Sequence, residues 1–255
     1  MSVKTILITG GASGIGWGIA ERLSAAGHTI IIADLNLAAA QSSAKALEAK
    51  GGTALAIELD VSQASQIAAL PALLLPHKVD VLINNAGIQH VSRLEDFPAD
   101  KWQLLINIML VGPALLTQAF LPSMRAQNYG RIINIGSVHS LIASPFKSAY
   151  VAAKHGLLGF AKTVALETGD CNVTINTICP AYVKTPLVEK QIAAQAIENG
   201  ISEEEVVSKI MLEPMPKKSF IEMDELAATA AFLIADSARN ITAQTLVIDG
   251  GWTAR

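Results

Sequence analysis

Short runs of apolar, mostly β-branched residues alternate along this chain with longer segments of helical composition. The strand-like runs cover residues 4–10, 29–34, 54–60, 79–87, 131–137, 173–180 and 245–251, and the helical segments cover 14–26, 36–50, 62–73, 99–126, 148–168 and 224–235. Several runs are continuously apolar, which is typical of parallel strands covered on both faces. The alternation predicts an α/β fold, a Rossmann-like doubly wound parallel sheet of about seven strands with helices on both faces.

One segment interrupts the alternation. Residues 186–220 are helical in composition but contribute no strand before residue 245. Ligands of doubly wound folds bind beyond the carboxyl ends of the strands, so this segment is expected to form a helical lid over a ligand; an extra surface hairpin is the alternative. Because the 255 residues show no composition shift or repeat, a single domain over 1–255 is expected.

The segment TGGASGIG (9–16) follows the first predicted strand and opens the first predicted helix. Glycines at positions 10, 14 and 16 suit a tight turn, a close approach of the backbone to a pyrophosphate, and a helix N-terminus that faces the anion. Asp34 ends the second strand, where a carboxylate accepts hydrogen bonds from ribose hydroxyls and repels a 2′-phosphate. No Arg or Lys follows within ten residues. NAD is therefore favoured over NADP, and capping of the next helix is a second, compatible role for Asp34.

Two further motifs end predicted strands on the same sheet edge. Asp60, in LDV (59–61), is expected to hold the adenine amino group. The segment NNAG (84–87) is expected to line the cofactor or to brace the strand ends. The alternative for these asparagines is turn formation.

The segment KSAYVAAKHG (147–156) places Tyr150 and Lys154 one helical turn apart. A cation beside a phenol favours phenolate and lowers the pKa, which would make Tyr150 an acid/base for a carbonyl or an alcohol. A packed tyrosine with a solvated lysine is the alternative. Ser137 ends the fifth strand, where its hydroxyl could hold a substrate oxygen. Asn107, in an apolar helix, could anchor a water for proton relay or be a core asparagine bonded to backbone.

The order TGxxxGxG, NNAG, Asn, Ser and YxxxK resembles the short-chain dehydrogenase/reductase family across essentially the whole chain. The resemblance implies a catalytic tetrad of Asn107, Ser137, Tyr150 and Lys154, with Lys154 also holding the nicotinamide ribose and Thr185 the carboxamide. The implied cofactor-binding residues are Gly10, Ser13, Gly14, Ile15, Gly16, Asp34, Asp60, Val61, Asn85, Ala86, Gly87, Tyr150, Lys154, Pro180, Val183 and Thr185.

Lys147 stands near the start of its predicted helix, where the macrodipole disfavours a cation. An anion bound to Lys147 would offset this unfavourable interaction. His139 and Gln89 are expected to face the same crevice, so the three side chains together offer donors to a carboxylate. Each also has a simpler reading, as a surface lysine, a loop histidine and a loop glutamine.

A narrower resemblance concerns a bacterial group of this family that acts on 3-hydroxybutyrate. It is carried by GIQHV (87–91), EDFP (95–98), GRIINIGSVHS (130–140), KSAYVAAKHG, PLVEKQI (186–192) and DGGWTAR (249–255). It implies reversible, NAD-dependent oxidation of (R)-3-hydroxybutyrate to acetoacetate, in which Tyr150 takes the hydroxyl proton. The implied substrate-binding residues are Gln89, Ser137, His139, Lys147, Tyr150, Tyr182 and Gln191, with Gln89, His139, Lys147 and Gln191 on the carboxylate.

Two positions depart from that group's pattern. Ala181 replaces a common Gly, and alanine tolerates a positive φ poorly. Tyr182 replaces a Trp, which leaves more room around the methyl end of the substrate. We therefore expect relaxed discrimination, with 3-hydroxyvalerate accepted.

Composition restricts the partners. A net charge of −3, a pI near 6.0 and no basic cluster argue against nucleic acid. Residues 102–124 are uncharged for long enough to suggest a membrane span, but Gln103, Asn107, Thr117 and Gln118 favour a buried or subunit-contact helix. Apolar residues make up 51% and charged ones only 16%, which suggests surface buried between subunits; the family resemblance implies a homotetramer.

The two cysteines and the N-terminus indicate the cellular compartment in which the protein is expected. Cys171 and Cys179 form neither a CxxC motif nor a disulfide framework and are read as buried, reduced thiols. The N-terminus lacks the features of a signal peptide. A cytoplasmic protein is expected, and no His, Cys and carboxylate cluster suggests a metal.

Two rival functions stay open. Another short-chain reductase, such as a 3-oxoacyl-carrier-protein reductase, would need a basic surface for its acidic carrier, and would leave Lys147 and His139 without a reason. A non-catalytic NAD-binding regulatory protein is hard to reconcile with four intact reactive positions.

Overall fold

The computed structural model of the chain describes residues 2–254, so the first and last residues of the expected domain lie outside the described residues. Within them, seven strands form one parallel sheet in the order β3-β2-β1-β4-β5-β6-β7. The strands are β1 (Thr5–Thr9), β2 (Thr29–Asp34), β3 (Thr53–Glu58), β4 (Val81–Asn84), β5 (Gly130–Ile135), β6 (Val173–Pro180) and β7 (Thr245–Ile248). The predicted doubly wound sheet is confirmed.

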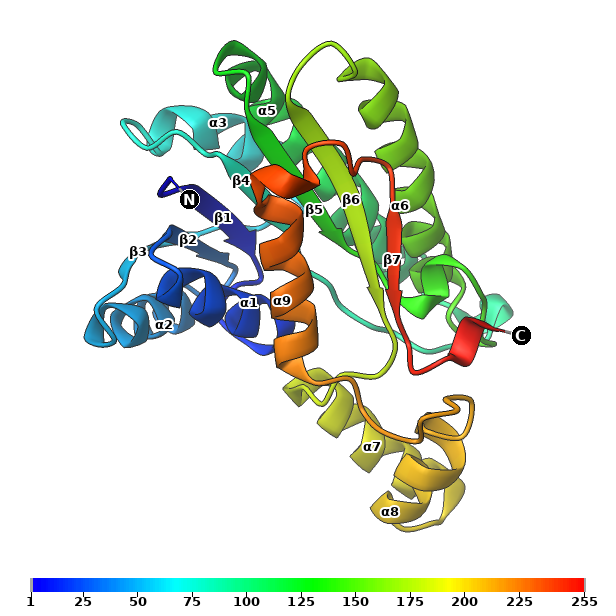
Figure 1. Ribbon diagram of the computed structural model, residues 1–255. Coiled ribbons are helices and arrows are strands. Elements are labelled where there is room, and N and C mark those ends of the chain that lie inside the picture. The colour runs from blue at the N-terminus through cyan, green and yellow to red at the C-terminus, as the bar shows by residue number, and fades with distance from the viewer. Residues whose placement is uncertain (1, 255) are drawn as a thin grey trace.

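Helices cover both faces of the sheet (Figure 1). One face carries α1 (Gly14–Ala25), α2 (Leu37–Ala49) and α9 (Met223–Ile234), and the other carries α3 (Ala64–Leu73), α5 (Gly112–Ala126) and α6 (Ser148–Glu167). The short helix α4 (Ala99–Ile106) packs against α6. Successive side chains of a strand point to opposite faces: Ile6 and Ile8 join the core under α1 and α9, whereas Leu7 joins the core under α3, α5 and α6. Covering both faces is why the strands read as unbroken apolar runs.

The strand order reverses between β1 and β4. These strands pair in parallel, with Ile6 opposite Val81 and Ile8 opposite Ile83. The glycine turn after β1 and the loop after β4 therefore emerge side by side at the carboxyl edge. In open α/β sheets this switch point is where ligands bind.

The helix predicted over 99–126 is continuous but not uniform. A π turn, Asn107–Val111, separates α4 from α5, and the N–H of Gly112 donates to the carbonyl of Asn107. A Cβ at Gly112 would lie 2.6 Å from the carbonyl oxygen of Val61, so only glycine permits this packing. Among the described residues, Ala99–Ala126 alone has the length and apolar character of a membrane span, with a mean hydropathy of 1.9. Leu116 and Phe120 nonetheless pack into the core beneath it.

The segment predicted to be a lid is helical. It forms α7 (Pro186–Asn199), α8 (Glu203–Val206) and a π turn, Val207–Met211, packed around Ile192, Val206 and Met211. Figure 1 shows α7 and α8 beyond the carboxyl ends of the strands.

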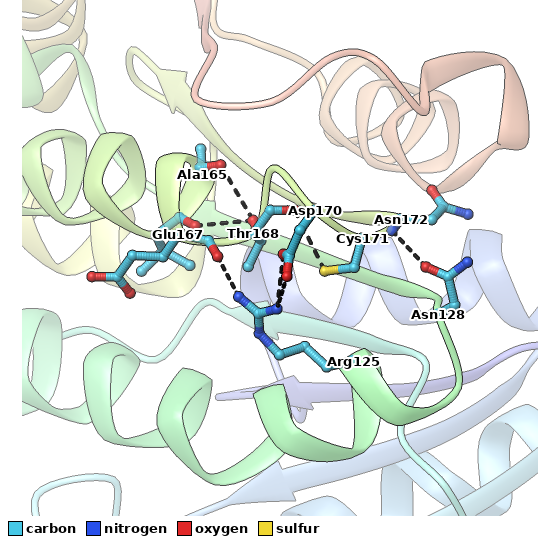
Figure 2. A network of polar contacts seen from close by, with 9 residues as sticks. Arg125, Asn128, Ala165, Glu167, Thr168, Asp170, Cys171 and Asn172 are labelled. Atoms are coloured by element: carbon cyan, nitrogen blue, oxygen red, sulfur yellow. Dashed lines mark hydrogen bonds and ion pairs between the residues drawn. The ribbon is translucent and has the colours of Figure 1, made fainter.

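The opposite, amino edge of the sheet is tied by a polar network (Figure 2). Arg125, at the end of α5, donates to both carboxylate oxygens of Asp170, at 2.8 and 3.0 Å, and to the carbonyl of Glu167. Cys171 lies in this network, with its Sγ 3.4 Å from the carbonyl oxygen of Thr168, and is only partly buried. The prediction of a buried thiol is therefore wrong for Cys171 but confirmed for Cys179, and both are free.

Candidate active site

A cavity of about 430 Å³ lies at the carboxyl edge of the sheet, between the loops after β1, β4, β5 and β6 and the start of α7. Every predicted site residue lines it except Gly16 and Asn107. The polar residues that sequence motifs scatter over 180 positions are thus brought to one place by the parallel sheet.

The glycine turn supplies one wall of the cavity. Gly10 and Gly14 have positive φ values of 60° and 54°, which L-residues adopt only at a cost. A Cβ at Gly10 would come within 3.0 Å of Ala86 Cα, and one at Gly16 within 2.5 Å of the carbonyl oxygen of Gly10. Gly16 therefore allows α1 to pack against the turn and does not itself face the cavity. The side chain of Ser13 makes no capping bond, so it does not cover the first amides of α1.

The loop after β4 braces this turn. The amide Nδ2 of Asn85 donates to the carbonyls of Thr9 and Gly10 at 2.9 and 3.0 Å. The hydroxyl of Thr9 in turn accepts from the backbone N–H groups of Asn85 and Ala86, both at 3.1 Å. Asn84 points into the sheet and donates to Asn134 at 2.9 Å. Residues 85–87, predicted as strand, thus leave β4 as the bracing loop.

Asp34 is held rigidly at the far end of the cavity. Its carboxylate accepts from the N–H groups of Ala12 at 3.2 Å and Asn36 at 3.1 Å. Asn36, whose Oδ1 accepts from Ala39, is the N-cap of α2. The capping role considered for Asp34 is therefore wrong, since the asparagine two residues later performs it. Asp60 lies on the neighbouring loop, with its Oδ1 accepting from the hydroxyl of Ser62 at 2.7 Å.

Ser137 opens a 3-10 turn, Val138–Ser140, directly after β5. Its N–H donates to Ser140 Oγ and its own Oγ accepts from the N–H of His139, both at 3.2 Å. This reciprocal capping fixes the position of the Ser137 hydroxyl, which is almost completely buried.

Tyr150 and Lys154 occupy successive turns of α6, as predicted. Lys154 Nζ lies 5.7 Å from the centre of the Tyr150 ring and donates to the carbonyl of Ile135 at 2.6 Å. Burial lowers the pKa of Lys154 to about 8. Burial also raises the pKa of Tyr150, and a hydrogen bond with Ser137 only partly offsets this rise. For these side chains the pKa of Tyr150 is therefore raised and not lowered as expected, because loss of hydration of the phenolate is the largest effect and the Lys154 ammonium is directed at the carbonyl of Ile135.

A half-buried cation lies beside these groups. Lys147 precedes α6 at the N-cap position, and burial lowers its pKa. Among the described residues it forms no ion pair. Gln89 Oε1 is buried nearby in the cavity wall and has no hydrogen-bond partner among residues 2–254, and Gln191 reaches the same cavity from α7. Thr185 caps α7 by accepting from the N–H of Val188 at 3.3 Å.

Asn107 lies outside the cavity. It ends α4, and its Oδ1 accepts from Gln103 Nε2 at 2.9 Å. The water-anchoring role expected for its side chain stays a prediction.

The ring of Trp252, which the sequence analysis did not mark as a site residue, completes the wall. Trp252 stacks on Tyr182 with centroids 5.8 Å apart and meets the ring of His139 edge-on at 6.0 Å. The C-terminal turn that carries Trp252 is held by Asp249, which accepts from the N–H and hydroxyl of Thr253 at 2.7 Å. Only the quoted C-terminal motif pointed to this region. Ala181 does not have the positive φ considered from its sequence; the described non-glycine residues with positive φ lie elsewhere.

A glycine turn at a helix N-terminus, a carboxylate after β2, and a serine, tyrosine and lysine at one end of the cavity define a nicotinamide-dependent oxidoreductase. The family model described as enoyl-(acyl carrier protein) reductase matches residues 10–253. The chain belongs to the short-chain dehydrogenase/reductase family.

Curated relatives span nearly the whole chain. A D-beta-hydroxybutyrate dehydrogenase of Rhizobium meliloti is 45% identical over 99% of this chain and 99% of its own length. One of Cupriavidus necator is 43% identical over 99% and 98%. A 3-oxoacyl-[acyl-carrier-protein] reductase of Synechocystis sp. is more distant, at 34% identity over 98% and 97%.

Proposed function

We propose that this protein catalyses the reversible, NAD-dependent oxidation of (R)-3-hydroxybutyrate to acetoacetate. Full-length similarity to two D-beta-hydroxybutyrate dehydrogenases supports the reaction. The observation that carries the substrate assignment is the half-buried Lys147, which forms no ion pair with the described residues and lies in the same cavity wall as Ser137 and Tyr150. A small acid with a hydroxyl two carbons from its carboxylate suits that arrangement of a cation and a hydrogen-bonding pair.

The cavity fits a dinucleotide. Gly14 faces Thr185. A Cβ added to Gly14 would lie 3.6 Å from the methyl group of Thr185 and would narrow the passage between the glycine turn and α7. Gly10, Gly14 and the first amides of α1 would hold the pyrophosphate, and Asp34 the adenosine ribose. The basic residues that line the cavity, Lys147, Lys154 and His139, belong to its other end, which favours NAD over NADP. When bound, the nicotinamide accepts or donates the hydride.

Tyr150 is assigned the proton transfer. A neutral phenol, which burial favours here, is the form that protonates the carbonyl oxygen of acetoacetate. In the oxidative direction Tyr150 must first lose its proton, and the Lys154 ammonium is the group that stabilises the phenolate. The single hydroxyl proton of Ser137 is assigned to the substrate oxygen.

The substrate carboxylate is assigned to Lys147, with Gln89, His139 and Gln191. Gln89 can turn its amide N–H toward an anion, and its buried oxygen has no protein partner to lose. Gln191 belongs to α7, which is part of the proposed lid (residues 186–220). Closure of this lid over the cavity would bring Gln191 to the substrate carboxylate.

Absorbance of the reduced cofactor tests this proposal. We expect turnover of (R)- but not (S)-3-hydroxybutyrate with NAD, and a Lys147→Ala variant whose KM for the acid rises at least about tenfold, because a charge-assisted contact is lost. Lys162→Ala, which removes an exposed lysine from the same helix, is the matched control. Equal turnover of both enantiomers, or an unchanged KM in Lys147→Ala, would contradict the assignment.

The rivals predict different results. A 3-oxoacyl-carrier-protein reductase would prefer a carrier-bound substrate to free acetoacetate, and a non-catalytic NAD-binding regulator would turn over neither. We further propose that the protein is a cytoplasmic homotetramer without a nucleic-acid or membrane partner, and that the reaction needs no metal.

A further inference from the structure

The C-terminal turn (residues 249–253) is built around one carboxylate. Asp249 Oδ1 accepts from the N–H of Gly251 at 2.8 Å, and its Oδ2 accepts from the N–H and the hydroxyl of Thr253, both at 2.7 Å. The backbone carbonyl of Asp249 accepts from the N–H of Trp252 at 3.2 Å. The side chain of Asp249 is almost fully buried, so these hydrogen bonds fix the path of the backbone through the turn.

The far end of the lid segment lies against this turn. Among residues 212–218, the N–H of Lys217 donates to the carbonyl of Gly250 at 3.1 Å. Gly250 has a φ of 60°, and a Cβ there would lie 3.1 Å from the end of the Met215 side chain and 3.3 Å from Lys217 Cβ. Glycine therefore permits both the bend of the turn and the close approach of residues 212–218.

Residues 212–218 belong to the main core and not to the core of the lid. Leu212 and Met215 are buried in the cluster between the sheet and α9, whereas Ile192 and Met211 belong to the separate cluster inside the lid. The change from one cluster to the other falls between Met211 and Leu212. The C-terminal turn is therefore the seat for the fixed end of the proposed lid.

The same turn carries an aromatic ring into the cavity wall. Trp252 stacks on Tyr182 and meets the ring of His139 edge-on. Tyr182 packs against both the main core and the core of the lid, and its carbonyl accepts from the N–H of Ile221 at 2.9 Å, where the lid segment returns to the sheet. The backbone of the turn thus holds the end of the lid, while its tryptophan holds the wall beside His139.

We propose that Asp249 is a positioning residue for recognition of the substrate carboxylate, because the turn that it fixes sets both the seat of the lid and the ring packed against His139. His139 and the lid residue Gln191 are both assigned to that carboxylate, so the inference rests on the proposed function. Asp249 is not among the described residues that line the cavity, and it acts through the turn without touching substrate or cofactor.

Steady-state kinetics test this role. Whichever way the amide of an Asp249→Asn variant turns, at least one donor of the turn loses its acceptor. We expect the KM for (R)-3-hydroxybutyrate to rise about tenfold, with kcat and the KM for NAD within about twofold of the parent values, because only binding of the acid is weakened. Thr253→Val, which removes one donor, should give a smaller rise, and Thr253→Ser, which keeps it, the parent KM. An unchanged KM for the acid in Asp249→Asn, or an equal rise in the KM for NAD, would overturn the proposal.

Gly250→Ala tests the seat of the lid itself. The added Cβ would press on Met215 and Lys217, whereas Gly51→Ala adds a Cβ at a φ of 85° with nothing within 4 Å and is the matched control for backbone strain. We expect the KM for the acid to rise in Gly250→Ala and to stay within about twofold of the parent value in Gly51→Ala. Equal KM values in the two variants would contradict the seating of the lid on the turn.

Hydrogen exchange at the Lys217 amide supplies a readout that does not depend on activity. Because this N–H is bonded to the carbonyl of Gly250, it should exchange about tenfold faster or more in Asp249→Asn, while the amide of Ile31 in the central strand β2 keeps its parent rate. A parent-like rate at Lys217 would overturn the proposal. If the parent protein turned over no 3-hydroxybutyrate, the proposed function would fail, whereas the exchange result would still decide whether Asp249 seats residues 212–218.

Discussion

At the scale of single residues, the stacked pair of Tyr182 and Trp252 sets the room at the end of the cavity. A Tyr182→Trp variant adds bulk there. We predict that it lowers the kcat/KM ratio of 3-hydroxyvalerate to 3-hydroxybutyrate about tenfold, because one methylene in an apolar pocket is worth about that much or more. Steady-state assays with both acids measure the ratio. An unchanged ratio would mean that Tyr182 does not limit substrate length.

The buried Lys154 leads to a second prediction at this scale, which concerns how the free energy of unfolding depends on pH. Its pKa is lowered from 10.5 to about 8 by burial, so above pH 8 the folded protein loses a proton that the unfolded chain still binds. The free energy of unfolding contributed by this site therefore rises with pH. Relative to Lys154→Met, the parent protein should gain about 2 kcal/mol between pH 8 and pH 10. Denaturant titrations at both pH values measure it, and a gap that shrinks as pH rises would contradict this.

At the scale of elements, α7 carries Gln191, the proposed carboxylate ligand from the lid segment. Gln191→Ala should raise the KM for 3-hydroxybutyrate about tenfold, since a hydrogen bond to a charged group is worth about 1.5–3 kcal/mol. The KM for NAD should stay within about twofold. Lys190→Ala, an exposed neighbour on the same helix, is the control. Equal effects of the two substitutions on KM would show that α7 does not recognise the acid.

Elements whose structure is set by nearby residues could be predicted from the sequence, whereas features that depend on contacts between distant residues could not. Alternating apolar runs identified the strands and helices, and because parallel strands must end at one edge, the motifs after them marked part of the cavity wall. The resemblance to the short-chain dehydrogenase/reductase family supplied the rest, including Thr185 and Gln191. The π turn after Asn107 was not predictable, since it depends on Gly112 packing against Val61 from another element. Trp252 was not marked as a site residue because only the folded C-terminal turn brings it to Tyr182. The pKa of Tyr150 depends on burial, which one-turn spacing does not encode.

At the scale of the whole molecule, a polar network that ties the chain together and the candidate active site lie at opposite edges of one sheet. The Arg125 and Asp170 network ties the amino edge (Figure 2), while Ser137 and Tyr150 stand at the carboxyl edge. β5 links both, from Gly130 at its start to Ile135 beside Lys154. Changes at the amino edge should therefore affect unfolding more than turnover.

The outer surface bears on assembly. Leu166 on α6 is 85% exposed, and Phe232 on α9 and Val247 on the edge strand β7 are also exposed. We predict a tetramer of the 26.8-kDa chain in light scattering, reduced in size by Leu166→Arg or Phe232→Arg, because a buried unpaired charge opposes association. Leu73→Arg, exposed on α3, is the control. A single-chain mass for the parent protein would contradict the expected assembly.

The proposed reaction depends on proton exchange by one phenol, so the most direct measurement is kcat for Tyr150→Phe with (R)-3-hydroxybutyrate and NAD. We predict a fall of about 10²–10⁴-fold, the usual contribution of a positioned acid/base, with NAD affinity within about twofold of the parent value. A Tyr150→Phe enzyme that oxidises the acid within tenfold of the parent rate would contradict it.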